Sequence, residues 1–259
     1  MKFLPQKFII IKTTFLGVIM SLGISSAWAL PPVMPKIGGI NFKPPKGSRY
    51  ALENGMIVYL LGDVTLPVVH ITAIARTGRI HDPKEKVGLG ELAVGLLKDG
   101  GTLKYKSDDI DKTLEFLGAS VESSIASEEA RVNMFALKKD LDKVLDIYAS
   151  VLTEPAFEND KIALKKAEAL ELIRRRNDAP DREAQREAVR AFYGAEHPYG
   201  WRPELTTIEP ITKDELSAYH ANYFRPNNII IAAAGDFGGE EEMLRKLNKR
   251  FGGWKKGEV

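Results

Sequence analysis

The four histidines are the side chains of this sequence best suited to bind a metal ion or to move a proton at neutral pH. They are His70, His81, His197 and His220, and no two of them have the spacing that places metal ligands on one helix face. The chain has no cysteine, so disulfides, thiolate zinc sites, iron–sulfur clusters and a thiol nucleophile are excluded. We therefore interpret all four histidines as surface or core residues.

Three further patterns are weak candidates for chemistry. Ser123 and Ser124 have no candidate base nearby in the sequence, which argues against a serine hydrolase. Asp99-Gly100-Gly101 is typical of a helix end, and the basic run Arg174–Asp178 is typical of a solvated helix terminus. None of these patterns by itself indicates a reaction.

The first 29 residues have the pattern of a secretory signal peptide. Three lysines precede the apolar run Phe15–Ile24, and Ala27 and Ala29 form a small-residue cleavage pattern. The run is about half as long as the roughly 20 residues that span a bilayer. We therefore predict cleavage after Ala29, no stable membrane span afterwards, and a periplasmic or secreted protein.

Removal of this segment changes the charge balance. The whole chain has 37 Lys and Arg against 35 Asp and Glu, and loss of three lysines leaves 34 basic residues and a net charge of about −1. A near-neutral domain has no electrostatic footprint for nucleic acid, so we expect no nucleic-acid partner. Residues 30–48 hold five of the fourteen prolines and are predicted to form a linker to the folded domain.

Regular hydrophobic periodicity begins at Arg49 and predicts one domain over residues 49–259. Asn54-Gly55 indicates a tight hairpin turn, because Asn and Gly tolerate positive φ angles. We expect strands at 49–52, 56–61, 67–77, 121–126, 130–137 and 228–235. We expect helices at 88–97, 107–117, 141–152, 159–176, 181–193, 212–222 and 239–251. This succession predicts an α+β fold, with one sheet and helices packed mainly on one face.

Five segments carry a family resemblance. They are NGMIVYLL, LPVVHITAIARTGRIHDPKEKVGLGELAVGLLKDGGT, EFLGASVESSIASEEARVNMFALKKDLDKVLDI, AFYGAEHPYG and YFRPNNIIIAAAGDF. In this order they resemble the N-terminal half of the insulinase/pitrilysin family of zinc metallopeptidases, which includes mitochondrial processing peptidase. The resemblance implies a metallopeptidase-like half resembling LuxS and processing peptidase. Because the chain ends at Val259, we expect the second half of the family architecture to be absent.

The resemblance also identifies the positions where active relatives bind zinc. Their motif is His-x-x-Glu-His, in which two histidines one turn apart bind the ion and the glutamate activates a water. Aligned on Gly88-Leu89, these positions are occupied by Glu91, Val94 and Gly95. We interpret Glu91 as a solvated or ion-paired helix residue, and Val94 can neither accept nor donate a proton.

A further glutamate ligand of active relatives falls at Glu171 or, with a shift of one residue, at Leu172. At best two carboxylates, Glu91 and Glu171, would remain, and two carboxylates without imidazole are poor zinc ligands. We therefore expect no catalytic residue, no metal ligand and no cofactor in this chain, although active relatives use zinc.

Three functional hypotheses follow. The leading one is a non-catalytic subunit that pairs with a zinc-bearing homologous peptidase and helps to bind or enclose unfolded or extended peptides. The family pairs an edge strand with substrate, and the corresponding residues here are Val121, Glu122, Ser123, Ser124, Ile125 and Ala126. The alternatives are an active metalloendopeptidase with an atypical metal site that includes Glu91 and Glu171, and a structural or assembly subunit of an envelope complex.

Overall fold

The computed structural model describes residues 44–178 and 180–258, and Pro45–Val259 forms one unit. The predicted signal peptide and residues 30–43 of the predicted linker lie outside the described residues. Ser48, the last residue of the predicted linker, is the first residue of a strand. Within the described part of the chain, no helix is both long and apolar enough to cross a membrane.

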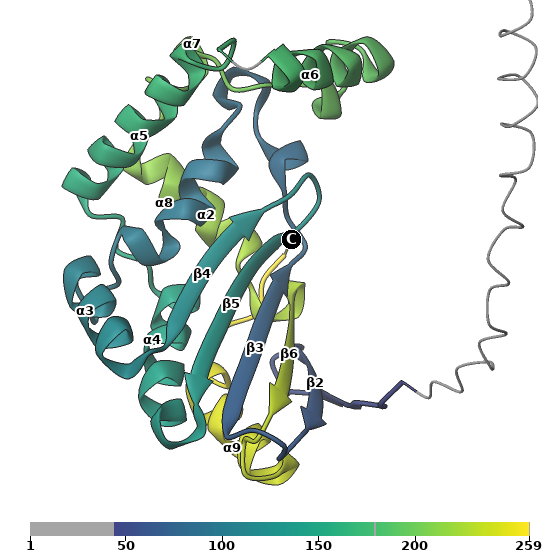
Figure 1. Ribbon diagram of the computed structural model, residues 1–259, viewed down its shortest axis with the longest axis vertical. Coiled ribbons are helices and arrows are strands. Elements are labelled where there is room, and N and C mark those ends of the chain that lie inside the picture. The colour runs from purple at the N-terminus through teal and green to yellow at the C-terminus, as the bar shows by residue number, and fades with distance from the viewer. Residues whose placement is uncertain (1–43, 179, 259) are drawn as a thin grey trace, which may run out of the picture. The chain divides into compact units, whose positions relative to one another are not determined.

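A mixed sheet of six strands forms the centre of the described domain (Figure 1). Its spatial order is β1-β2-β6-β3-β5-β4, with β6 parallel to β2 and antiparallel to β3. The other neighbouring pairs are antiparallel. The strands are β1 Ser48–Ala51, β2 Ile57–Gly62, β3 Val68–Ala75, β4 Ser120–Ile125, β5 Ala130–Leu137 and β6 Ile229–Gly235.

Helices pack against one face of this sheet, and Figure 1 views the sheet from its other face. The helices of the described residues are α2 Leu89–Asp99, α3 Ser107–Leu117, α4 Leu141–Thr153, α5 Asn159–Arg174, α6 Pro180–Tyr193, α7 Leu205–Ile208, α8 Lys213–Tyr223 and α9 Glu240–Phe251. The predicted α+β class with helices mainly on one face is confirmed. The four-residue helix α7 and the short 3-10 helices, including Pro198–Gly200, were not expected, because such short turns show no periodicity.

Strand alternation explains how β3 holds the layers together. Val69, Ile71 and Ala73 are at most 1% exposed and face the helices, whereas His70 faces the open side of the sheet. In the helix layer, the buried Tyr148 hydroxyl of α4 donates to the Val132 carbonyl of β5 at 2.8 Å. The period-2 pattern therefore identified the buried face of the sheet correctly.

The first hairpin differs in detail from the predicted two-residue turn. Residues 52–56 separate β1 from β2, the Gly55 N–H donates to the Leu52 carbonyl, and only Gly55 in this loop has a positive φ, of 86°. The Asn54 side chain instead donates to the Phe251 carbonyl at the end of α9, at 2.7 Å. A long-range contact thus determines the conformation of Asn54, and local turn preference cannot reveal such a contact.

Candidate functional site: a cavity between α2 and α5

Helix α2 carries the positions that the resemblance assigns to the zinc motif, and a buried carboxylate holds its first turn. Asp82 accepts hydrogen bonds from the backbone N–H groups of Gly88 at 2.7 Å and Gly90 at 2.8 Å. Gly88 precedes the helix with φ of 105°, a conformation that favours glycine. Burial raises the pKa of Asp82 to about 6, although the two N–H donors favour its charged form. The start of α2 is therefore fixed by the loop before it.

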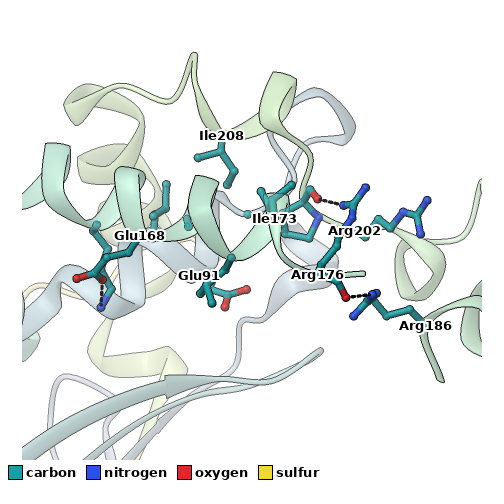
Figure 2. A pocket seen from close by; sticks show the side chains of 13 residues that line it. Glu91, Glu168, Ile173, Arg176, Arg186, Arg202 and Ile208 are labelled. Atoms are coloured by element: carbon teal, nitrogen blue, oxygen red, sulfur yellow. Dashed lines mark hydrogen bonds and ion pairs between the residues drawn. The ribbon is translucent and has the colours of Figure 1, made fainter. Parts of the chain in front are cut away.

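A cavity of about 380 Å³ lies between α2, α5 and the segment that leads into α7. Figure 2 shows Glu168 at one end and three arginines at the other, with Ile173 and Ile208 between them. The lining residues are Gly88, Glu91, Leu92, Lys165, Glu168, Ala169, Leu172, Ile173, Arg176, Arg186, Arg202, Pro203 and Ile208. The cavity thus has apolar walls and charged ends.

The three motif positions on α2 have different surroundings. Glu91 lies on the cavity wall and is exposed, with its carboxylate 3.9 Å from the Arg79 guanidinium. Val94 is 1% exposed and belongs to the hydrophobic core. Gly95 faces α5, and a Cβ placed on it would lie 3.2 Å from Cε of Lys165. A lysine side chain therefore adjoins Gly95, the position that the resemblance assigns to the second histidine.

The structure of α5 distinguishes Glu171 from Leu172, the two alternatives for the further glutamate ligand of active relatives. Leu172 lines the cavity together with Glu91, and its side chain is 72% exposed. Glu171 is not among the lining residues, and its carboxylate contacts Arg175 Nε at 2.6 Å. The structure therefore brings Leu172, and not Glu171, to the cavity wall that holds Glu91.

Sequence reasoning missed Glu168, which is the second carboxylate of the cavity. Glu168 precedes Leu172 by four residues on α5, so the two share a helix face, and its carboxylate lies 3.6 Å from Lys165 Nζ. The helical spacing from Leu172 could have identified Glu168, but only if Leu172 had been chosen over Glu171.

These side chains do not form a zinc site. Two carboxylates, Glu91 and Glu168, share the cavity with the ammonium of Lys165, and no imidazole lines it. No group of three or more His, Cys, Asp or Glu residues suited to one ion occurs within residues 44–178 and 180–258. Zinc prefers imidazole and thiolate ligands, and a nearby ammonium repels the ion. The charged side chains of this cavity therefore do not match the ligands with which active relatives bind zinc.

The four histidines lie apart from this cavity, since none of them lines it. His70 packs against Phe135 with ring centroids 4.9 Å apart, and His81 Nδ1 accepts the Gly78 N–H. His197 Nδ1 accepts the Tyr199 N–H at 3.2 Å. Burial lowers the pKa of His220 to about 4, and its Nε2 lies 2.9 Å from the Leu152 carbonyl oxygen.

Strand β4 is an edge strand, since no strand of the described residues pairs with its outer side. The Ala126 N–H donates to the Glu129 carbonyl at 2.8 Å, and the pairing continues in register from Ile125 opposite Ala130 to Ser120 opposite Phe135. Backbone groups alternate in direction along an antiparallel strand, so Val121, Ser123 and Ile125 direct their N–H and C=O groups away from β5.

Helix α2 packs beside this edge strand. The Ser123 hydroxyl donates to the Val94 carbonyl at 2.7 Å, which joins β4 to α2 directly. The edge strand, the helix against it and the cavity on that helix thus lie together in one α+β domain.

Comparisons with known proteins agree with this class. The profile described as "Insulinase (Peptidase family M16)" matches residues 63–199, and "Peptidase M16 inactive domain" matches residues 210–259. The chain belongs to the insulinase family of peptidases, as the resemblance implied.

Sequence similarity to curated relatives covers most of this chain. The chain is 24% identical over 209 residues to "Uncharacterized zinc protease YmxG" of Bacillus subtilis, covering 80% of this chain and 50% of the relative. It is 22% identical over 210 residues to "Zinc protease PqqE" of Helicobacter pylori, covering 80% of this chain and 46% of the relative. The chain therefore spans about half the length of the curated relatives it matches.

Solved structures show the same fold. A peptidase M16 inactive domain from Pseudomonas fluorescens superposes with a TM-score of 0.77 at 22% identity, covering 83% of this chain and 52% of that chain. A protease from Helicobacter pylori gives a TM-score of 0.75 at 21% identity, with the same coverage of both chains.

Proposed function

We propose that this chain is a non-catalytic member of the insulinase family that is exported, holds extended peptide along β4 and pairs with a zinc-bearing homologue. The observation that supports this most directly is the set of residues at the motif positions. The two histidine positions of active relatives are occupied by Glu91, which is ion-paired, and by Gly95, which lies beside Lys165. The position of the base is occupied by Val94, which is a core residue.

Loss of the base position matters more than loss of a single ligand. Hydrolysis by this family needs a carboxylate beside a metal-bound water, and the side chain of Val94 is apolar and packed in the core. An atypical metal site built on Glu91 and Glu171 is not favoured, because Glu171 pairs with Arg175 and does not line the cavity.

The edge of β4 supplies peptide binding without catalysis. An extended peptide paired there would form main-chain hydrogen bonds to Val121, Ser123 and Ile125. Because α2 covers the inner face of β4, the added strand would lie beside the helix that carries the motif positions. A homologue with an intact motif would supply the zinc and cut the peptide, and export would place both chains in the periplasm or outside the cell.

Metal content and peptide cleavage test the lack of catalysis. We expect the purified protein to contain no stoichiometric zinc by mass spectrometry and to leave an unfolded peptide intact with or without chelator. Chelator-sensitive cleavage that is lost in both Glu91→Gln and Glu171→Gln would instead establish an atypical metal site.

Peptide binding at the edge is tested by a matched pair of variants. Ser123→Pro removes one outward N–H group, and edge strands tolerate proline. Ser123→Ala removes only the hydroxyl that contacts Val94. We expect fluorescence anisotropy to show weaker binding of an extended peptide to the proline variant than to the alanine variant. Equal binding by both variants would contradict the role of β4.

The partner is tested by copurification from the native host. Recovery of a homologue that carries an intact His-x-x-Glu-His motif is expected. A complex that contains no peptidase would favour the structural role, and a lone monomer would contradict pairing.

A further inference from the structure

A second cavity, of about 430 Å³, lies beside the C-terminal part of α6. It adjoins the first cavity, because Arg186 and Arg202 line both. Its wall combines three guanidinium groups with an aliphatic and two aromatic side chains, which are those of Arg186, Arg190, Arg202, Val189, Tyr199 and Trp201. No carboxylate is part of this wall.

The three arginines differ in how their charge is balanced. Arg202 contacts Glu187 at 2.7 Å and Glu204 at 3.1 Å. Arg186 is paired with Glu183. Arg190 forms no ion pair with any residue that the structure describes. One cation of the wall is therefore uncompensated.

Two buried donors of the same wall lack acceptors. Arg186 Nε and Trp201 Nε1 are buried and have no hydrogen-bond partner among the described residues. Both groups can only donate, and a buried donor without an acceptor is unfavourable. Both donors are closed to solvent, so an anion in the cavity would pair with the exposed guanidinium of Arg190.

We propose that this cavity binds an oxyanion, a carboxylate or a phosphate monoester, that carries an aromatic or apolar group. The exposed guanidinium of Arg190, beside those of Arg186 and Arg202, binds the oxyanion. Val189, Tyr199 and Trp201 contact the apolar group. The volume lies within the range of small-molecule sites, roughly 300–1,000 Å³, so a bare inorganic ion would leave most of the cavity to water. This site goes beyond the proposed function, because it uses neither β4 nor the motif positions on α2.

The indole N–H resonance of Trp201 provides a direct measurement on the full chain. The sequence has three tryptophans, and Trp201→Phe assigns this signal while it retains an aromatic wall. We expect 3-phenylpropionate or phenyl phosphate to shift the Trp201 resonance and leave that of Trp254 in place. Whichever of the two anions binds more tightly identifies the carboxylate or the phosphate as the preferred oxyanion.

Variants at Arg190 test the charge. Arg190→Gln is expected to weaken binding about tenfold, the loss of one charge-assisted hydrogen bond, and Arg190→Lys to weaken it less. Arg49→Gln removes the same charge from an exposed position on β1 and is expected to leave binding unchanged.

Neutral and inorganic probes separate the two parts of the proposal. 3-Phenylpropionamide has the same apolar group without the charge, and inorganic phosphate has the charge without the apolar group. Both are expected to bind more weakly than the tighter organic anion. The proposal is overturned if the amide or inorganic phosphate binds as tightly, or if Arg190→Gln and Arg49→Gln bind alike.

Discussion

Substitution of His220 is expected to change how the stability of this domain depends on pH. His220 lies on α8, where its ring stacks on Phe224 and its Nε2 lies 2.9 Å from the Leu152 carbonyl oxygen. This contact requires the nitrogen to carry a proton, so the neutral ring donates to the carbonyl. Burial lowers the pKa of His220 from 6.5 to about 4, because the charged ring would lose its hydration.

The sign and size of the effect follow from proton linkage. Between pH 6.5 and 4 the unfolded chain binds a proton at His220 that the folded chain does not bind, so stability falls as the pH falls. One pKa unit corresponds to about 1.4 kcal/mol, which makes the full loss about 3 kcal/mol below pH 4. At pH 5 the loss relative to pH 8 is about 2 kcal/mol.

Urea unfolding of the wild type and His220→Gln at pH 8 and pH 5 measures this loss. The variant loses the ring stacking at both pH values, but its side chain does not titrate. We expect the stability difference between wild type and variant to shrink by about 2 kcal/mol at pH 5. His70→Gln, at an exposed position of β3, is the control for the substitution of a histidine by glutamine. A difference that is the same at pH 8 and pH 5 would refute the assignment of a buried neutral imidazole.

Two further predictions concern α2. The stability of the wild type relative to Asp82→Asn is expected to decrease by about 2 kcal/mol as the pH rises from 4 to 7, because the folded chain retains a proton on Asp82 up to about pH 6. Urea unfolding at both pH values measures this change, and a constant difference would contradict the raised pKa. The triple variant Glu91→His, Val94→Glu, Gly95→His is expected to bind no stoichiometric zinc by mass spectrometry, because Lys165 adjoins the new histidine and the distal ligand is missing. Burial of an unpaired carboxylate at position 94 should also destabilise the triple variant by several kcal/mol. Tight zinc uptake by the triple variant would contradict the expectation that the surroundings of α2 do not support a zinc site.

Local patterns predicted most elements because burial on one face imposes a period. The alternation of β3 and the periodicity of α4 identified residues that are buried, such as Val69 and Leu145. Helix α5 begins at the predicted Asn159 but ends at Arg174 and not at Arg176. The Asn54 turn was less accurate, because a contact distant in sequence determines it. The short helix α7 had no signal of its own.

The sequence by itself determined the family, because the order of its similar segments needs no coordinates. It also shows which residues, Glu91, Val94 and Gly95, stand at the positions that the resemblance assigns to the zinc motif. Tertiary structure decided which side chains now surround those positions. The rotation of α5 against α2 places Leu172 and Glu168 on the cavity wall and leaves Glu171 paired with Arg175. Sheet order decided that β4 is an edge, and the packing of α6 gathered arginines that the sequence shows only as scattered charges. These features depend on how elements distant in the chain face one another, and a periodic pattern within one element does not contain that information.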